Sequence, residues 1–499
     1  MQMILDLNAN TMELKKEKII LFLIFLLSFG FRLFFLFRVP FFSSDEAYFN
    51  LRHANYILEN FLPIIYDPQS YGGNIILNTH IFHYFLGFFD LFFSNFIVYK
   101  ILPCLLASSI VIIIYYFIKE VTKNESAALF GALLWAFIPS YIGASLNQIS
   151  VLSLFVPLFL LCLYFFLNIK ERQRLFLYSA AVLVLLDPLD LLMLFTIIIF
   201  SLLMYAESFS LKKEEKEGIG LFIVFFVLVN LILYKTLYLE QGLTAIWQNL
   251  PLELYGQIFQ NFNLFETINS IGFIPLILGI IGLIIYKEKN RTITLFKAIL
   301  MADFTLLLLR LIPFQVGILF IAIILCICAG ISIDRFIQYF RLTKFAKSEK
   351  MVLSIFILLT MVSLIIPSTN IALDVVDNGI HIEEIEAMQW IKFNTPRSSV
   401  ILGNVYEGNM IIALADRINV WDTQFFHAED RITDVEIIFT TESLIKAKKS
   451  MDRYNVDYIY FSEKTKEIYD VEGLAYVKDE SCFKELYKNE FASIYQVVC

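Results

Sequence analysis

Two adjacent carboxylates, Asp45 and Glu46, follow the first long apolar run of the chain, within the segment FFSSDEAYFNLRHANYI. A carboxylate can take a proton from an acceptor hydroxyl group, or it can hold a divalent metal ion through hard oxygen ligands. On a helix that starts here, Arg52 shares a face with Asp45, and His53 shares the adjacent face with Glu46. Because a nearby cation can neutralise a phosphate leaving group, the segment has the groups needed for transfer from a phosphate-linked donor.

A second interpretation of the same segment is purely structural. Ser43 and Glu46 have the spacing of a capping box, with Ser43 as the N-cap residue. Acidic residues in a first turn also complement the helix dipole. Asp45 and Glu46 would then only start a helix over residues 47–60 that lies in the membrane interface. The two roles are compatible, so the spacing alone leaves both open.

Further candidate residues lie outside this segment. Arg310 stands at the outer end of a predicted membrane span, and Arg32 lies just inside the outer end of the first span. An arginine inside a membrane is costly and is usually functional, although it can also extend to the lipid headgroups. His80 and His83 have the spacing of helical metal ligands, but without a visible third ligand they are better explained as interfacial aromatic residues.

The composition indicates which elements must position these residues. Of the 499 residues, 58% are hydrophobic and 17% are charged, whereas a soluble domain is about one quarter charged. Apolar runs near twenty residues recur, and each is long enough to cross about 30 Å of hydrocarbon. The first run, residues 19–37, is too long for a signal-peptide core and lacks a small-residue cleavage site. The sequence therefore predicts a polytopic α-helical membrane protein.

Eleven apolar runs predict eleven transmembrane helices. They lie at about 18–37, 98–118, 125–143, 151–168, 174–189, 190–206, 219–238, 269–286, 292–311, 314–333 and 350–367. One set of alternate gaps holds 19 Lys and Arg residues, and the other set before residue 368 holds three. The positive-inside rule assigns the first set to the cytoplasm. We therefore expect a protein of the cell membrane with a cytoplasmic N-terminus, and with a first loop, a loop at about 239–268 and a C-terminal domain outside.

The C-terminal segment, residues 368–499, differs in composition from the transmembrane part, residues 1–367, which includes the first outer loop at 38–97. It holds 13 Lys and Arg against 23 Asp and Glu residues, a net charge of −10. Its patterns predict strands in SSVILGN and VDYIYFS and helices in IEEIEAMQWIKFN and TESLIKAKKSMDRYN. This alternation is typical of a small extracytoplasmic α/β domain. Nothing in it indicates binding of nucleic acid.

Two cysteines fall near the end of this segment. Cys482 and Cys499 flank a predicted hairpin that turns near Asn489, which would place them opposite each other. In an oxidising compartment such a pair can form a disulfide. The other four cysteines lie in apolar spans and are expected to be ordinary core residues.

The chain resembles the GT-C membrane glycosyltransferases. The resemblance rests on FRLFFLF at the end of the first span, the loop opening DEAYFNLR, then YGG, and a histidine before the next helix. Enzymes of this type transfer sugars carried on polyprenyl phosphates. The resemblance implies a polyprenyl-phosphate sugar donor, a lipid-linked glycan or protein as acceptor, and contact with membrane lipid. It also implies substrate binding by Arg310, with Arg52, Arg32 and His80 as further candidates.

The resemblance matches the acidic pair in two registers. The protein O-mannosyltransferase and aminoarabinose transferase branch has the catalytic candidate at the first acid of the pair, which is Asp45 here. The oligosaccharyltransferase catalytic subunit has a motif similar to YFNLR, and that register places a metal-binding acid at Glu46. The implied cofactor is a divalent cation, Mg²⁺ or Mn²⁺. Asp45 and Glu46 both remain catalytic candidates.

The chain also departs from the family pattern. Where an acid is common, NQIS offers Asn147, Gln148 and Ser150, which are weaker metal ligands than a carboxylate. Where a basic residue is common, the chain has Asp187, which flanks Pro188 and is interpreted as a turn residue, with a position facing the active cavity as the alternative. GNVYEGN replaces the WWDYG motif that recognises the acceptor sequon. We therefore expect transfer of a single sugar on the outer face of the membrane. The alternatives are an oligosaccharyltransferase-like enzyme of protein N-glycosylation, and a non-catalytic transporter, flippase or assembly subunit.

Overall fold

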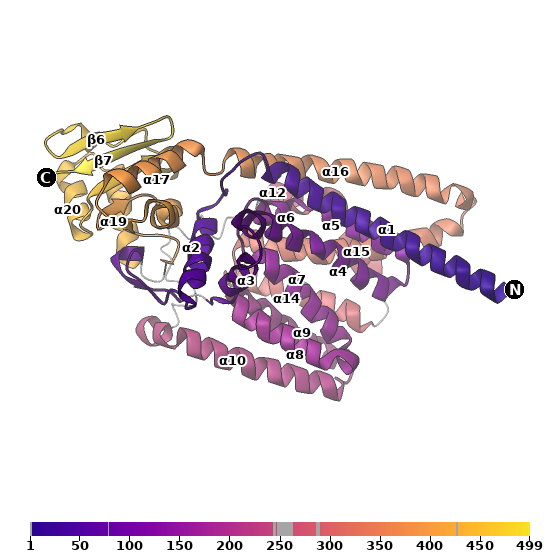
Figure 1. Cartoon of the computed structure of the whole chain (residues 1–499). Coiled ribbons are helices and arrows are strands. Elements are labelled where there is room, and N and C mark those ends of the chain that lie inside the picture. Colours follow the sequence, from indigo (N-terminus) through magenta and orange to yellow (C-terminus); the bar gives the residue numbers. More distant parts are fainter. Residues whose placement is uncertain (1, 78, 243–245, 247–262, 286–289, 426–427) are drawn as a thin grey trace.

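A computed structural model describes residues 2–77, 79–242, 246, 263–285, 290–425 and 428–499 (Figure 1). Long helices lie side by side in a bundle, and a smaller domain of strands and short helices stands at one end of it. The N-terminus is at the opposite end of the bundle from this domain. The outer loop predicted at about 239–268 lies mostly outside the described residues.

The bundle consists of long apolar α-helices. They are α1 (Gln2–Leu36), α4 (Leu102–Thr122), α5 (Glu125–Ala136), α6 (Pro139–Ser145), α7 (Leu152–Leu167), α8 (Ile169–Leu186), α9 (Leu191–Ala206), α10 (Lys213–Gln241), α12 (Leu264–Ile271), α13 (Phe273–Ile285), α14 (Arg291–Leu308), α15 (Phe314–Arg341) and α16 (Glu349–Asp377). Helix α15 is the centre of the bundle, since every residue from Gly317 to Asp334 is buried. Helices α4, α5, α13 and α14 pack directly against it, and the remaining helices pack mainly on one another.

The described residues contain six helices long and apolar enough to cross a membrane, or up to eight if each bent helix pair is one span. The bent pairs are α5–α6, with an angle of 51°, and α12–α13, with an angle of 87°. Helix α7 is shorter than a span, and α8 and α14 carry more charges than an apolar span, among them Arg172 and Asp303. A polytopic helical architecture is therefore confirmed, whereas the count of eleven spans is not.

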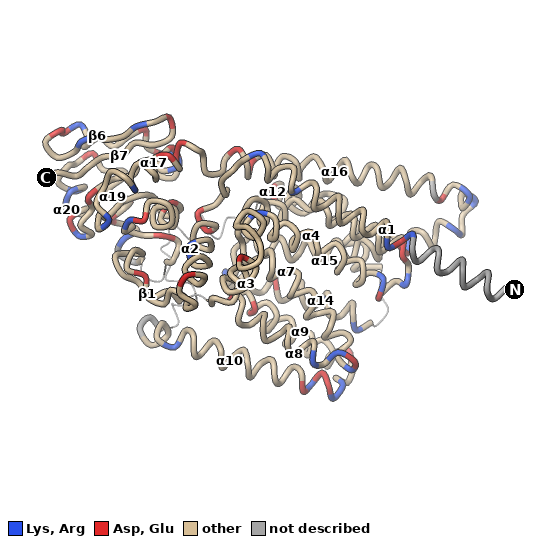
Figure 2. Tube along the Cα trace, viewed as in Figure 1, with Lys and Arg blue, Asp and Glu red and all other residues tan. Residues whose placement is uncertain are grey.

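Lys and Arg residues are unevenly distributed along the bundle. Figure 2 shows them gathered around the turns at the end of the bundle that is farthest from the C-terminal domain. At the other end, a segment between α1 and α4 contains α2 (Asp45–Asn60), β1 (Tyr66–Asp67), η1 (Ser70–Gly72), β2 (Asn74–Ile75), α3 (Ile81–Asp90) and η2 (Ile97–Ile101). Helix α3 corresponds to the short interfacial helix expected in the first outer loop.

The predicted capping box at the start of α2 is wrong. The N-cap residue is Ser44, and its side chain makes no capping hydrogen bond. Ser43 Oγ instead accepts a hydrogen bond of 2.7 Å from Asn147 Nδ2. Both the hydroxyl and the amide of Ser43 are hydrogen-bonded to Asn147, in the turn after α6. Ser43 and Glu46 therefore do not cap the helix together.

The C-terminal domain is built on a five-stranded sheet in the order β4-β3-β5-β7-β6. Its strands are β3 (Val400–Leu402), β4 (Ile418–Asn419), β5 (Tyr458–Ser462), β6 (Phe483–Lys488) and β7 (Ala492–Val497). Strand β3 is parallel to β4 and β5, whereas β7 is antiparallel to β5 and β6. The helices are α17 (Ile382–Asn394), α18 (Gly408–Met410), α19 (Glu429–Thr440), α20 (Leu444–Arg453) and α21 (Glu463–Tyr469). This is an α/β domain with a mixed sheet.

The hairpin at the end of the chain brings its two cysteines together. Strands β6 and β7 pair with Phe483 opposite Val497, so that the residues just outside the ladder are also neighbours. Cys482 and Cys499 form a disulfide with their Cα atoms 4.6 Å apart. The other four cysteines are buried and free. The register of the hairpin is therefore what permits the bond.

The first outer segment and the C-terminal domain pack together as one unit. Ser70 Oγ donates a hydrogen bond of 2.7 Å to Asp422 Oδ2, and Tyr71 Oη donates one of 2.8 Å to the Asp422 carbonyl. Asn419 Oδ1 accepts from the Tyr71 amide at 2.8 Å, and Arg431 donates to the Tyr71 carbonyl at 2.9 Å. Tyr71 is only 5% exposed and lies within the core of the domain. The loop after α2 is therefore held by the domain around Tyr71, and by the bundle where Thr79 Oγ1 donates to the Leu186 carbonyl at 2.7 Å.

Candidate active site

A cavity of about 430 Å³ lies where α2, the turn after α8 and the C-terminal domain meet. Its walls combine carboxylates, amides, hydroxyls and one ammonium group with a few apolar side chains. The lining residues are Ser43, Ser44, Asp45, Glu46, Phe49, Asn50, Thr79, His83, Val151, Leu186, Asp187, Pro188, Tyr406, Thr423, Gln424 and Lys464. Both predicted acids are among them, together with groups from four separate parts of the chain.

Asp45 is held by the C-terminal domain. Its Oδ1 accepts a hydrogen bond of 2.7 Å from the Met410 amide, and its Oδ2 accepts from Asn409 through the side chain at 2.7 Å and the backbone at 3.3 Å. The residue is 4% exposed. Burial raises the pKa of Asp45 to about 6, although these hydrogen bonds favour the charged form. Both carboxylate oxygens therefore already serve to join α2 to α18.

Glu46 has a different environment from its neighbour. Its side chain lines the cavity and is exposed there, surrounded by the other groups of the cavity wall. Burial raises the pKa of Glu46 to about 7, and the carboxylate of Asp187 raises it further, while a hydrogen bond from Asn50 opposes both. The pKa of Asp187 is itself raised by burial to about 6. Two carboxylates, from α2 and from the turn after α8, thus face the same space.

Lys464 is the only Lys or Arg among the residues described as lining the cavity. It belongs to α21, and its Nζ lies 5.5 Å from the centre of the Tyr406 ring, which is also part of the wall. The C-terminal domain therefore contributes a cation to a cavity whose acids come from the first outer segment and the bundle. Such a charge distribution suits a ligand that carries both hydroxyl and phosphate groups.

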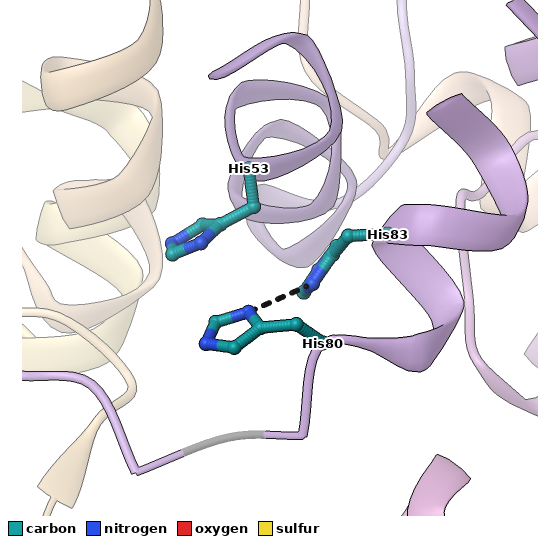
Figure 3. A group of neighbouring side chains, drawn as sticks. All are labelled: His53, His80 and His83. Atoms are coloured by element: carbon teal, nitrogen blue, oxygen red, sulfur yellow. Dashed lines mark hydrogen bonds between the residues drawn. The ribbon is translucent and has the colours of Figure 1, made fainter. Parts of the chain in front are cut away.

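Three histidines from two neighbouring parts of the chain form a cluster (Figure 3). His53 comes from α2, His80 directly precedes α3, and His83 lies in its first turn. Burial lowers the pKa of His80 to about 4 and that of His83 to about 3, and it lowers the pKa of His53 as well. The three imidazoles are therefore neutral at pH 7. His83 is the member that also lines the cavity.

The arginines predicted to bind substrate do not line the cavity. Arg52 forms an ion pair with Asp67 and donates to Gln69 Oε1 at 2.8 Å. Arg32 is 1% exposed within the bundle, where it donates to Ser28 Oγ at 3.0 Å and lies over the Tyr141 ring. Arg310 follows α14 as an exposed residue with a φ of 54°. Its assignment to the donor phosphate stays a prediction.

Asn147, which stands where the family often has an acid, serves a structural role. Its amide nitrogen donates to the Phe41 carbonyl at 2.9 Å and to Ser43, and its Oδ1 accepts from Lys100 Nζ at 2.9 Å. Lys100 also donates to the carbonyls of Val39 and Phe41 at 3.1 and 2.9 Å. The Lys100 ammonium group is thus bound to Asn147 Oδ1, which is the atom that would have to coordinate a metal ion.

Local sequence patterns identify only part of the cavity and of the histidine cluster beside it. Asp187 was predicted to be a turn residue, with a cavity-facing role as the alternative, and it is the alternative that the lining of the cavity favours. Lys464 gave no signal, because it lies far from Glu46 in sequence on an ordinary charged helix. His53 was noted on the face adjacent to Glu46, but its neighbours in α3 depend on how the two helices pack.

Solved structures with the same fold include an archaeal oligosaccharyltransferase and a bacterial ArnT. No family model and no curated protein matches the chain. The oligosaccharyltransferase of Archaeoglobus fulgidus, tethered to an acceptor peptide with an NVT sequon, superimposes with a TM-score of 0.68 at 14% identity over 96% of this chain and 74% of that one. ArnT from Cupriavidus metallidurans, bound to undecaprenyl phosphate, gives 0.58 at 9% identity over 98% of both chains. The chain therefore has the GT-C fold.

Proposed function

We propose that this protein is a membrane glycosyltransferase that moves a sugar from a polyprenyl-phosphate carrier to an acceptor in the cavity beside Glu46. The observation that carries the proposal is that Glu46 and Asp187 line one cavity of a GT-C fold, where the charge of Asp187 raises the pKa of Glu46. Two proteins with this fold are an oligosaccharyltransferase studied with dolichol-phosphate and an ArnT bound to undecaprenyl phosphate. A lipid-linked donor is the substrate class that these similarities support.

Glu46 is the proposed general base. Its carboxylate accepts the proton of the acceptor hydroxyl while the acceptor oxygen forms a bond to the anomeric carbon of the sugar. The bond between that carbon and the phosphate oxygen breaks, and polyprenyl phosphate leaves with the electron pair. A direct displacement of this kind inverts the anomeric centre. A pKa near 7 suits a group that must accept a proton at neutral pH.

Asp45 has a positioning role in this proposal. Its two oxygens are engaged by Asn409 and Met410, so it fixes the start of α2 against the C-terminal domain rather than meeting the acceptor. Lys464 is proposed to neutralise the leaving phosphate, because it is the cation of the cavity wall. The predicted phosphate-binding roles of Arg310, Arg52 and Arg32 are not needed for this arrangement.

The cavity also fits the predicted divalent cation. Glu46 and Asp187 would hold it, since carboxylate oxygens are the ligands that Mg²⁺ and Mn²⁺ prefer and two facing carboxylates repel each other without a cation. When bound, the cation would supply positive charge to the phosphate that leaves. A related oligosaccharyltransferase structure contains zinc and sulfate.

A single sugar is favoured over a whole oligosaccharide as the transferred group. The segment GNVYEGN, which stands in place of the sequon-recognition motif, is used here to bind Asp45 through Asn409. The oligosaccharyltransferase-like alternative predicts instead that a peptide with an Asn-x-Thr sequon is the acceptor. A non-catalytic transporter or assembly subunit predicts no transfer at all.

The active face is proposed to be extracytoplasmic. The Lys and Arg residues gather at the bundle end remote from the cavity, which the positive-inside rule assigns to the cytoplasm. The disulfide between Cys482 and Cys499 belongs in an oxidising compartment. Both observations support an outward-facing C-terminal domain and cavity.

The test is an assay of sugar transfer in membranes that contain the full chain. Radiolabelled polyprenyl-phosphate sugars are supplied with either a lipid-linked glycan or a sequon peptide as acceptor. Wild-type protein is expected to label the lipid-linked glycan. Glu46→Gln should lower the rate by a factor of about 10² to 10⁴, the usual contribution of a general base.

Glu59→Gln is the matched control, because Glu59 is an exposed residue on the same helix. Its rate should equal that of the wild type. Labelling of the peptide alone would favour the oligosaccharyltransferase-like alternative. If Glu46→Gln transfers sugar as fast as the wild type, Glu46 is not the base and the proposed mechanism fails.

A further inference from the structure

The histidine cluster has the geometry of a metal site. The candidate ligand nitrogens of His53, His80 and His83 all lie within 4.8 Å of one another. His80 Nδ1 and His83 Nδ1 are 3.3 Å apart (Figure 3). Two imidazole nitrogens bound to one tetrahedral zinc ion are separated by about 3.3 Å, because each Zn–N bond is about 2.0–2.1 Å long. The Nδ1 atoms of His80 and His83 therefore already have the separation of two ligands of one zinc ion.

His53 is the member that most requires a partner. It is 0% exposed, and neither ring nitrogen has a hydrogen-bond partner. Buried polar atoms without partners are uncommon, and a bound ion is one of the recognised reasons for them. The His53 ring lies 5.1 Å from that of His83 and 5.6 Å from that of His80, centre to centre. His53 is therefore the third imidazole of the cluster, and its nitrogens are near enough to those of the other two to share one ion.

The hydrogen bonds around His83 leave its Nδ1 atom unprotonated and therefore able to bind a metal ion. Asn50 Nδ2 donates to the Ile149 carbonyl at 2.7 Å, which turns Asn50 Oδ1 toward His83 Nε2 at 2.8 Å. Because that oxygen only accepts, Nε2 must carry the proton, and Nδ1 then presents its lone pair to the cluster. A hydrogen bond from the second ring nitrogen to an oxygen is the usual support of a metal-bound histidine.

We propose that His53, His80 and His83 bind a late transition-metal ion, of which Zn²⁺ is the representative. Three neutral imidazoles suit Zn²⁺, Cu²⁺ or Ni²⁺, and they are poor ligands for Mg²⁺ and Mn²⁺, which prefer oxygen. The site is separate from the carboxylates of the cavity. Glu46 and His53 are seven residues apart on α2, a distance of about 10 Å along the helix axis.

The ion would tie α2 to the segment that enters α3. His53 is on the same helix as Glu46, and His83 and Thr79 belong to another part of the cavity wall. Bound metal would therefore fix the spacing between these two walls. Its predicted role is to stabilise the cavity, not to contact the transferred sugar.

The test uses the full chain in detergent, purified with a tag that contains no histidine and stripped with a chelator. Zn²⁺ is added, excess metal is removed by desalting, and the bound metal is measured by mass spectrometry. Wild-type protein should retain one Zn²⁺ per chain, with a higher midpoint of thermal unfolding than the stripped form. Bound Co²⁺ should give the visible absorption bands of a tetrahedral nitrogen site.

His80→Ala is the primary variant, because His80 is partly exposed and its loss should leave the fold intact. It should weaken Zn²⁺ binding at least tenfold, and His53→Ala should abolish it. Asn50→Ala should weaken binding by a factor of about 10 to 100. His381→Ala and Glu46→Gln should bind Zn²⁺ as the wild type does.

The proposal is overturned if wild-type protein retains no Zn²⁺, or if His80→Ala retains it with unchanged affinity. Neither result bears on sugar transfer, which depends on Glu46.

Discussion

At the scale of single residues, the decisive contrast is between Asp45 and Glu46. They are adjacent in sequence, yet successive residues on a helix point about 100° apart, so they meet different surroundings. Asp45 points to the backbone of Met410, and Glu46 points to Asp187 across the cavity. The sequence identified the pair but could not divide their roles, because the partners that distinguish them come from residues 187, 409 and 410.

Asp45→Asn should destabilise the contact between α2 and the C-terminal domain. In the variant, an NH₂ group replaces one of the two oxygen atoms that accept hydrogen bonds from Asn409 and Met410, so one of these donors loses its acceptor. Leaving a buried donor unpaired costs about 1–3 kcal/mol, so the midpoint of thermal unfolding should fall by a few degrees. Differential scanning fluorimetry of the full chain measures this. Glu46→Gln should melt like the wild type, and equal melting of both variants would remove the anchoring role of Asp45.

Glu407 should make the stability of the chain depend on pH. It is 1% exposed, it accepts hydrogen bonds from Ser462 Oγ and from the Asn404 amide, and burial raises its pKa from 4.5 to about 8. A carboxyl group with a raised pKa favours the folded state fully below its unfolded pKa. That contribution is lost as the pH rises from about 4.5 through 8.

Glu407→Gln removes the titrating group and keeps the shape of the side chain. The variant should therefore gain stability relative to the wild type as the pH increases from 5 to 8.5, as measured by thermal unfolding at each pH. If the two proteins differ in unfolding temperature by the same amount at pH 5 and at pH 8.5, Glu407 does not titrate as described.

At the scale of elements, close helix packing at the bundle centre depends on two glycines of α13. A Cβ atom at Gly282 would lie 2.1 Å from the Cys328 carbonyl oxygen of α15, and one at Gly279 would lie 2.7 Å from the Leu325 carbonyl oxygen. Small residues permit such approach between membrane helices. The sequence predicted both helices from their apolar length, but not that these two glycines form their interface.

Gly282→Ala should force α13 away from α15. Because the nearest atoms belong to the backbone, they cannot move aside as a side chain would, and overpacking of this kind costs about 1–3 kcal/mol. The midpoint of thermal unfolding of the detergent-solubilised chain should decrease. Gly220→Ala on α10 is the control, since a Cβ atom there meets nothing within 4 Å. Equal stability of the two variants would contradict the close contact.

Local patterns predicted the elements of the C-terminal domain well. The strands β3 and β5, the helices α17 and α20, and the final hairpin all lie within the predicted segments. The capping box at Ser43 failed because a residue from the turn after α6, Asn147, competes for the same hydroxyl. Arg52 forms an ion pair with Asp67 of the following strand, a partner that its position on α2 does not predict. Local patterns do not report such partners.

At the scale of the whole molecule, the cavity exists because three parts of the chain converge. The first outer segment supplies Glu46, the bundle supplies Asp187, and the C-terminal domain supplies Lys464. Composition and apolar runs predicted the bundle and the separate domain, because hydrophobicity and charge can be summed over each segment without knowledge of its partners. The docking of the loop through Tyr71 into the domain core depends on shape and was not predictable.

The central claim is that Glu46 carries the proton transfer of a sugar-transfer reaction in this cavity. The most direct measurement is the initial rate of transfer from a labelled polyprenyl-phosphate sugar by wild-type, Glu46→Gln and Glu59→Gln proteins in the same membranes. The account predicts equal rates for the wild type and Glu59→Gln, and a rate at least about 100-fold lower for Glu46→Gln. A rate for Glu46→Gln equal to that of the wild type would contradict it.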